Sequence, residues 1–94
     1  MANYIVRVEL HSATWDDYER LHASMRRRGY SRIIKSNQGV RYQLPTGTYV
    51  AENTPDSLQA ALEAATEAAK ETGRQSWVVV ADWKSARWRG LVKV

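Results

Sequence analysis

The chain contains two histidines, and histidine is the side chain best suited to move a proton near neutral pH. His11 follows the first predicted strand, where a side chain is usually exposed. In the expected topology its neighbours are Arg74, Gln75 and Ser76. A histidine base and a guanidinium there could act on an RNA 2′-hydroxyl and its phosphate; the alternative is a loop histidine without a role. His22 falls within the apolar stripe of a helix, which favours a packed histidine with one nitrogen hydrogen-bonded.

The segment Trp83–Arg89 interleaves aromatic and cationic side chains. Indole rings stack on bases while arginine and lysine bind phosphates, so this composition is typical of single-strand binding without sequence readout. Its candidate RNA contacts are Lys84, Arg87, Trp88 and Arg89. The same residues also fit a hairpin tip that is anchored by tryptophans and covers a sheet edge.

Positive charge is unevenly distributed along the chain, which has a formal net charge of +4. Residues 51–73 hold one Lys and five acids, whereas residues 1–50 hold eight cations and four acids, and residues 74–94 hold five cations and one acid. Such segregation suits a surface facing a polyanion or a head-to-tail protein contact. The further candidate RNA contacts are five arginines: Arg26, Arg27, Arg28, Arg41 and Arg74. For the three consecutive arginines, the alternative is stabilisation of the carbonyl end of a helix.

Motifs that would identify a reaction are absent from the sequence. Without cysteine, the chain has no disulfide, thiolate zinc site or cysteine nucleophile. It has no phosphate-binding glycine loop, dinucleotide fingerprint, HExxH or GxSxG motif, and it lacks the aromatic signature of an RRM. Glu9 and the pair Asp16–Asp17 are the acids that could converge on a metal ion, although the pair also fits a helix N-terminus. We assign no cofactor and no metal ligands, and a divalent ion stays open.

The first predicted helix has readable ends. Thr14 is followed three residues later by Asp17, a combination that caps a helix N-terminus, and Gly29 ends the helix. Arg20 faces away from the core, within reach of the two aspartates. The apolar stripe comprises Trp15, Tyr18, Leu21 and Met25.

The second predicted helix begins within Thr54–Ser57, with Pro55 at its first position, and ends at Thr72–Gly73. Its apolar face is mostly alanine, so we expect this helix to lie close to a sheet. Period-2 alternation predicts strands at residues 4–10 and 40–44. Residues 31–35 form a further predicted strand, 36–39 a hairpin turn, and 48–51 another extended run, so the middle of the chain is a hairpin or a three-stranded meander, and either piece could be the third core strand. Residues 77–81 are almost continuously apolar, which indicates a strand covered on both faces.

The resulting order, βαββαβ, predicts a single α+β domain over residues 1–94. We expect a ferredoxin-like split βαβ sandwich, with two helices on one face of an antiparallel sheet. Residues 91–94 add a C-terminal strand that extends the sheet edge or pairs across a dimer. No apolar run is long enough to span a bilayer, and the start of the chain alternates like a strand rather than a signal peptide. These patterns favour a cytoplasmic protein.

Four stretches within residues 3–57 carry a family resemblance: Asn3–Val6, Ser31–Ile34, Gly39–Pro45 and Tyr49–Ala51. In them the chain resembles the GhoS-like antitoxin endoribonucleases of type V toxin–antitoxin systems. The resemblance implies a ferredoxin-like fold, close to that of the small CRISPR-associated nucleases. It also implies cleavage of a toxin messenger RNA, with or without a metal ion.

The resemblance places a polar family position at the end of the first strand on Glu9. It places basic positions of the first helix on Arg20 and His22. With His11, these are the candidate catalytic residues. We therefore expect an RNA-acting protein, an endoribonuclease or a descendant of one, that forms a homodimer. The alternatives are a non-catalytic dimeric accessory protein of phage or mobile-element origin and a small-ligand regulatory domain.

Overall fold

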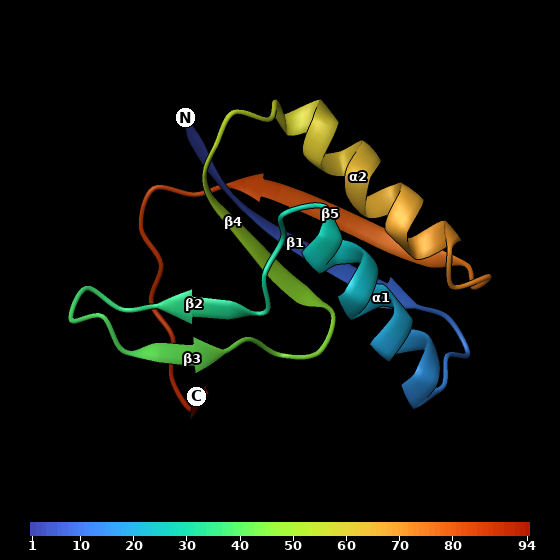
Figure 1. The fold of residues 1–94 in the computed structure, drawn as a ribbon, viewed down its shortest axis with the longest axis horizontal. Coiled ribbons are helices and arrows are strands. Elements are labelled where there is room, and N and C mark those ends of the chain that lie inside the picture. Colours follow the sequence, from blue (N-terminus) through green and yellow to red (C-terminus); the bar gives the residue numbers. More distant parts are fainter.

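The computed structural model covers residues 1–94 and shows an α+β protein with the order βαβββαββ (Figure 1). Two three-stranded antiparallel sheets form, with strand orders β4-β1-β5 and β2-β3-β6. Both helices lie on the same face of the first sheet. The strands are β1 (Ala2–Leu10), β2 (Ile33–Lys35), β3 (Arg41–Gln43), β4 (Thr48–Thr54), β5 (Ser76–Asp82) and β6 (Val92–Lys93), and the helices are α1 (Trp15–Arg27) and α2 (Leu58–Lys70).

The α+β class is confirmed, but the prediction of one ferredoxin-like sheet is wrong. Such a sheet would pair the strand after α1 with β4 along its length. Only Ser31 makes this pairing, through two backbone hydrogen bonds of 2.8 Å with Val50. The chain then leaves the sheet because the turn at residues 36–39 pairs β2 locally with β3. The β2–β3 hairpin therefore belongs to a second sheet.

The main core lies between the first sheet and the two helices. β1 is the central strand, and its alternate residues Tyr4, Val6, Val8 and Leu10 are buried beneath the helices, as the period-2 pattern predicted. The alanine-rich face of α2 is also buried, at Ala61, Ala65, Ala68 and Ala69. Small side chains let this helix pack close to the strands.

The predicted ends of α1 are confirmed. The hydroxyl of Thr14 accepts a hydrogen bond from the Asp17 N–H, and the Asp17 carboxylate accepts one from the Thr14 N–H. Beyond the helix, Gly29 has a φ of +94°, the left-handed conformation that a glycine adopts easily. Trp15 is an exception to the predicted apolar stripe because 67% of it is exposed.

The predicted start of α2 is wrong by about one turn. β4 continues to Thr54, and Ser57 caps the helix by accepting a hydrogen bond from the Ala60 N–H. Pro55 lies in the connection before this cap. The reason is that neighbouring groups fix the connection: the Tyr4 hydroxyl donates to the Asp56 carbonyl, and the Tyr30 hydroxyl donates to the Asp56 carboxylate.

β5 is covered on one face only, contrary to the prediction. Val78 and Val80 pack against the main core, but Trp77 is 65% exposed and Val79 is 63% exposed on the opposite face. No helix covers that face. None of the helices is long and apolar enough to cross a membrane.

A second, smaller core forms on the far side of β4. Ile34, Leu44 and Val50 are buried there, and Trp83, Trp88 and Leu91 pack against them. The last strand, β6, pairs with β3 of the same chain, so it extends the second sheet and not the first. The C-terminal residues 83–94 thus contact both the hairpin and the main sheet and hold them together.

Candidate nucleic-acid interface

Unpaired positive charge is concentrated on the hairpin and the C-terminal segment. Residues 31–44 and 83–94 contain seven of the 14 Lys and Arg and no acid, whereas the rest of the chain contains seven cations and all ten acids. None of the seven forms an ion pair; all ion pairs in the structure involve other residues. We call this set the cationic surface: Arg32, Lys35, Arg41, Lys84, Arg87, Arg89 and Lys93.

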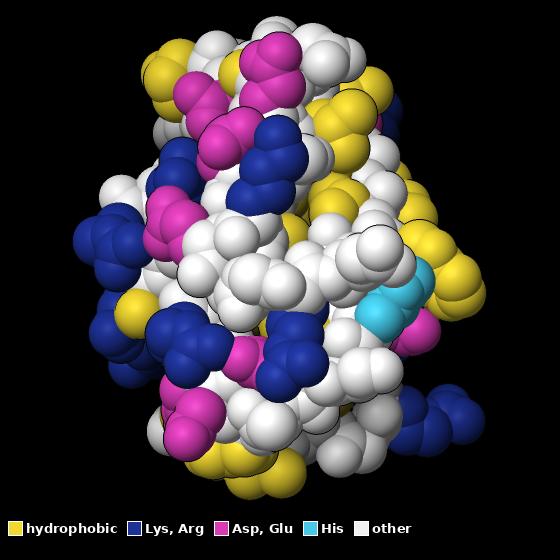
Figure 2. Space-filling view, turned by 90° about the vertical axis from the view of Figure 1, so that its right-hand side faces the viewer, with side chains coloured by type: hydrophobic (Ala, Val, Ile, Leu, Met, Phe, Trp, Pro, Cys, Tyr) yellow, Lys and Arg dark blue, Asp and Glu magenta, His cyan; other side chains and the backbone are white.

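The helical part of the molecule neutralises its arginines locally. Arg27 and Arg28 both donate to the Glu71 carboxylate, at 3.1 and 2.7 Å. Hydrogen bonding of the Glu71 carboxylate with Arg28 and Ser24, together with the charges of Arg28 and Arg27, lowers the pKa of Glu71 below its ordinary value. Figure 2 shows cationic and acidic side chains lying side by side on this end of the molecule. Of the three consecutive arginines, Arg26 alone has no acidic partner.

Asp17 holds two further arginines. Arg20 pairs with one carboxylate oxygen, and the Arg74 Nε donates to the other at 2.7 Å. The Thr14 N–H contributes most to a lowered pKa of Asp17, and Arg74 lowers it further, while burial acts in the opposite direction. Arg74 and Arg20 are therefore occupied with helix capping in this structure.

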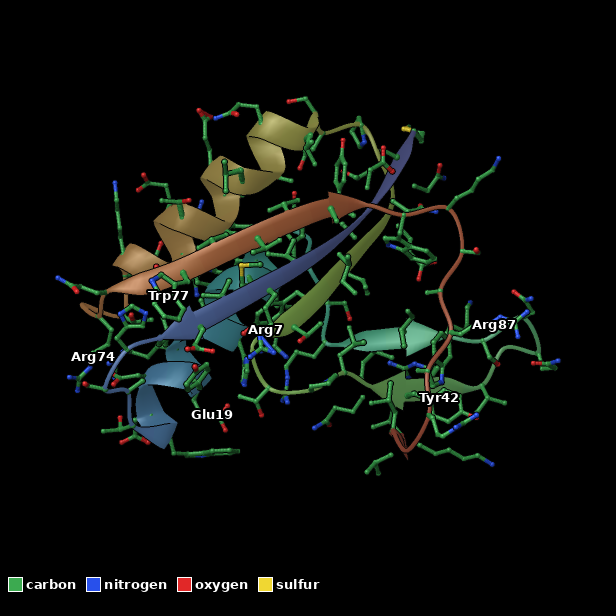
Figure 3. The ribbon with its side chains drawn as sticks, turned by 180° about the vertical axis from the view of Figure 1, so that it is seen from behind. Arg7, Glu19, Tyr42, Arg74, Trp77 and Arg87 are labelled. Atoms are coloured by element: carbon green, nitrogen blue, oxygen red, sulfur yellow. The ribbon has the colours of Figure 1, made fainter.

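A cleft of about 690 Å³ opens between the hairpin tip and the C-terminal segment. Figure 3 shows this segment crossing the hairpin on the face turned away from the helices, with Tyr42 and Arg87 near the crossing. Glu52 is the one acid in the lining. The cations that line the cleft are Lys35, Lys84, Arg87 and Arg89.

The tryptophans of the C-terminal segment hold the cleft together. Trp83 and Trp88 pack on the second core, and the Trp88 ring meets the Tyr42 ring edge-on, with centroids 5.5 Å apart. The tryptophans thus anchor the segment as the alternative proposed, but the segment is not a hairpin tip, because β5 and β6 belong to different sheets. The anchoring leaves Lys84, Arg87 and Arg89 exposed to solvent, so the two interpretations are compatible.

The open face of the first sheet holds two of the candidate catalytic residues. The Glu9 carboxylate lies 3.5 Å from the Arg7 guanidinium, and Glu9 is paired with Trp77 across the strands. The His11 ring meets the Trp77 ring edge-on at 4.6 Å. Figure 3 shows Arg7 and Trp77 on this face. The backbone N–H of His11 donates to the Gln75 carbonyl at 2.8 Å, which confirms the predicted neighbourhood of His11.

His22 lies elsewhere, in the wall of a smaller pocket of about 220 Å³. Its Nδ1 is 2.6 Å from the Tyr49 hydroxyl, and its Nε2 is buried without a partner, as predicted for a packed histidine. Burial lowers the pKa of His22, and the Arg32 charge lowers it further. The four candidate catalytic residues thus do not converge on one site: Glu9 and His11 share Trp77 as a neighbour, whereas Arg20 pairs with Asp17 and His22 with Tyr49.

Sequence reasoning missed Arg32, Lys35 and Lys93. The available signal was the absence of acids from residues 31–44, which was hidden because a count over residues 1–50 averages the hairpin with the acidic start of α1.

No three His, Asp or Glu side chains converge in the way that a metal site requires.

No protein-family model matches the chain, and no curated protein is significantly similar to it in sequence. The GhoS-like resemblance therefore stays a prediction based on the four short stretches.

Proposed function

We propose that the protein binds single-stranded RNA through the cationic surface. The observation that carries the proposal is that seven unpaired cations lie on two segments without any acid, and that Glu52 is the one acid in the lining of their cleft. Phosphate contacts supply most of the affinity of sequence-independent RNA binding, and unpaired exposed cations make them without first breaking an ion pair. The partly exposed Tyr42 and Trp88 rings lie beside these cations.

The shape of the cleft favours a single strand over a duplex. A volume of about 690 Å³ lies within the roughly 300–1,000 Å³ that a ligand the size of a nucleotide fills. A flexible strand can insert one nucleotide at a time, whereas a duplex presents a wide, stiff surface. Lys35 on one wall and Arg87 and Arg89 on the other could then contact successive phosphates.

Two double variants test this assignment with the same loss of charge. Arg87→Ala/Arg89→Ala removes two cations of the cleft, and Arg27→Ala/Arg28→Ala removes two that are paired with Glu71. Fluorescence anisotropy with a labelled single-stranded RNA is expected to show affinity reduced about tenfold or more in the first variant, because each pair of lost phosphate contacts costs upwards of 1.4 kcal/mol. The second variant is expected to stay within about twofold. Equal losses in both would contradict the assignment.

We further propose, on the GhoS-like resemblance, that the bound RNA is a toxin messenger and is cleaved. Incubating end-labelled RNA with the protein, with Mg²⁺ or Mn²⁺ and with a chelator, tests this step directly. Cleavage that is lost in His11→Ala or Arg20→Ala supports the endoribonuclease. Intact RNA under every condition, together with unchanged behaviour of both variants, would rule it out.

The alternative, a non-catalytic dimeric module, is favoured by one observation. Trp77 and Val79 expose apolar surface on an edge strand, which is a usual site of association. Sedimentation of the intact chain and of a Trp77→Ser variant would show a dimer that is weakened by the substitution. A monomer at all concentrations would remove this alternative.

A further inference from the structure

The pocket beside His22 is rich in hydrogen-bond donors that have no acceptor. Its wall contains His22, Arg26 and Arg32, together with Ser31 and Gln43. His22 is only 9% exposed, and both its Nε2 and the Arg32 Nε are buried without a hydrogen-bond partner. Neither Arg26 nor Arg32 forms an ion pair. Leaving such groups unsatisfied is costly, so the site is suited to a ligand that supplies acceptors.

The hydrogen bond to Tyr49 determines which nitrogen of His22 carries the proton. Tyr49 is fully buried, and the His22 Nδ1 is the sole partner of its hydroxyl. Burial raises the pKa of Tyr49 well above its ordinary value, so the phenol keeps its proton. If Nδ1 carried a hydrogen, the tyrosine hydrogen would be buried without an acceptor. The hydroxyl therefore donates to Nδ1, and Nε2 carries the imidazole hydrogen.

In this tautomer Nε2 is a donor and has no lone pair to accept a proton. The geometry thus suits binding of an anion better than general-base catalysis. Two unpaired guanidinium groups flank this donor, and they match the charge of a dianion. The pocket volume of about 220 Å³ is below the range that accommodates a whole nucleotide, but it accommodates a single tetrahedral anion.

We propose that the pocket formed by His22, Arg26 and Arg32 binds a phosphate group, and that on RNA this group is a terminal monophosphate. The second part rests on the proposed RNA function, and the first does not. A terminal phosphate can enter a small pocket alone, whereas an internal diester brings a nucleoside on each side. Because Nε2 and the Arg32 Nε are covered from solvent, we expect the Arg32 side chain to rotate when phosphate binds.

The acid nearest in effect to His22, Glu19, provides a second test of whether the pocket binds an anion. Glu19 on α1 is the one acid whose charge reaches His22, and it opposes an anion; the other rings beside His22 are those of Tyr18 and Tyr49. Because Glu19 is exposed, replacing it with glutamine should leave the fold intact. Glu19→Gln is therefore expected to bind phosphate more tightly than the natural chain.

The experiment is an NMR titration of the two histidine ring signals with inorganic phosphate, with chloride at matched ionic strength as the reference. The His22 signals are expected to shift and saturate, while those of His11 serve as an internal control. Arg32→Gln should weaken the affinity for phosphate about tenfold, because it removes a charge-assisted hydrogen bond to the anion. Arg27→Ala, which removes a neighbouring charge that is paired with Glu71, should leave the response unchanged.

A second arm compares 5′-phosphorylated, 3′-phosphorylated and unphosphorylated RNA of one sequence. A preference of about fivefold or more for one phosphorylated end, lost in Arg32→Gln and retained in Arg87→Ala/Arg89→Ala, would support the terminal-phosphate site. Equal affinity for all three RNAs would overturn that part. If His22 does not respond to phosphate, or if His11 responds equally, the pocket assignment is wrong. Loss of RNA binding alone, with the His22 response to phosphate retained, would contradict the proposed function but not the pocket.

Discussion

Individual side chains in this protein act through partners that are far away in the sequence. Asp17 caps α1 locally, yet it also accepts a hydrogen bond from Arg74, 57 residues later. His22 bonds to Tyr49, 27 residues later, and thereby has its tautomer determined. The family resemblance made His22 a candidate catalytic residue, whereas its hydrogen bond to Tyr49 favours anion binding.

The burial of His22 predicts a pH dependence of stability. The folded chain holds this imidazole with a lowered pKa, whereas the unfolded chain has the ordinary value of 6.5. Between these two values the unfolded chain binds more protons, so the free energy of unfolding should fall as the pH drops below about 6.5. The slope is limited to about 1.4 kcal/mol per pH unit, the value for one proton.

Urea unfolding between pH 7 and pH 5 would measure this effect. His22→Gln should remove the slope in that range, and His11→Gln should retain it. The charged and titratable groups around His22 are Arg32, Glu19, Arg26 and the phenols of Tyr18 and Tyr49, and all of them are retained in both variants. If the slope disappeared in His11→Gln and persisted in His22→Gln, His11 would be the source of the pH dependence, and the prediction for His22 would be wrong.

At the level of elements, the β3–β4 connection is bound to the central strand of the main sheet at Gly47. Gly47 has a φ of +83°, and a Cβ atom there would lie 2.4 Å from the Val8 carbonyl oxygen. The Gly47 carbonyl accepts a hydrogen bond from the Val8 N–H at 2.7 Å, so the turn is bound directly to β1. Both the backbone angle and the close approach require glycine.

Gly47→Ala is therefore expected to destabilise the protein by about 2–4 kcal/mol, from left-handed strain together with the backbone clash. Gly39→Ala is the matched control, because its φ is +85° and nothing lies within 4 Å of an added Cβ. It should cost only about 1–2 kcal/mol, the strain alone. Urea denaturation compares them, and equal losses would show that the contact with Val8 does not matter.

Elements with local signals could be predicted from the sequence, and those governed by distant contacts could not. The Thr14 cap and the alternation of β1 are local, and both are confirmed. The prediction of where α2 begins was wrong because both Pro55 and Ser57 are residues that favour a helix start. The hydrogen bonds from Tyr4 and Tyr30 to Asp56 decide between the two positions. The exposure of Trp77 could not be inferred, because an apolar run does not show how many layers cover it.

At the scale of the whole molecule, the distinction between paired and free cations depends on the fold. Lys84, Arg87 and Arg89 were candidate RNA contacts from their composition, and they lie unpaired on one cleft. Arg27 and Arg28 were candidate RNA contacts as well, but in the structure they pair with Glu71, which lies 43 or more positions away in the sequence. Ion-pair partners of this kind leave no local pattern, so the candidate surface could be only half predicted.

The resulting charge distribution gives the molecule two dissimilar parts. The hairpin and the C-terminal segment carry only cations, whereas the rest of the chain carries seven cations and ten acids and is therefore net acidic. Association with a polyanion is accelerated and oriented by such a field, and it weakens as salt screens it. The size of the salt effect therefore reports how many phosphates the cationic surface neutralises.

The most direct test of the account is the salt dependence of single-stranded RNA binding. On a plot of the logarithm of affinity against the logarithm of salt concentration, each phosphate contact contributes about 0.7 to the slope for a single strand. Arg87→Ala/Arg89→Ala is thus expected to reduce the steepness by about 1.4, with the slope of Arg27→Ala/Arg28→Ala unchanged. An unchanged slope in the first variant, or an equal reduction in both, would contradict the role of the cationic surface.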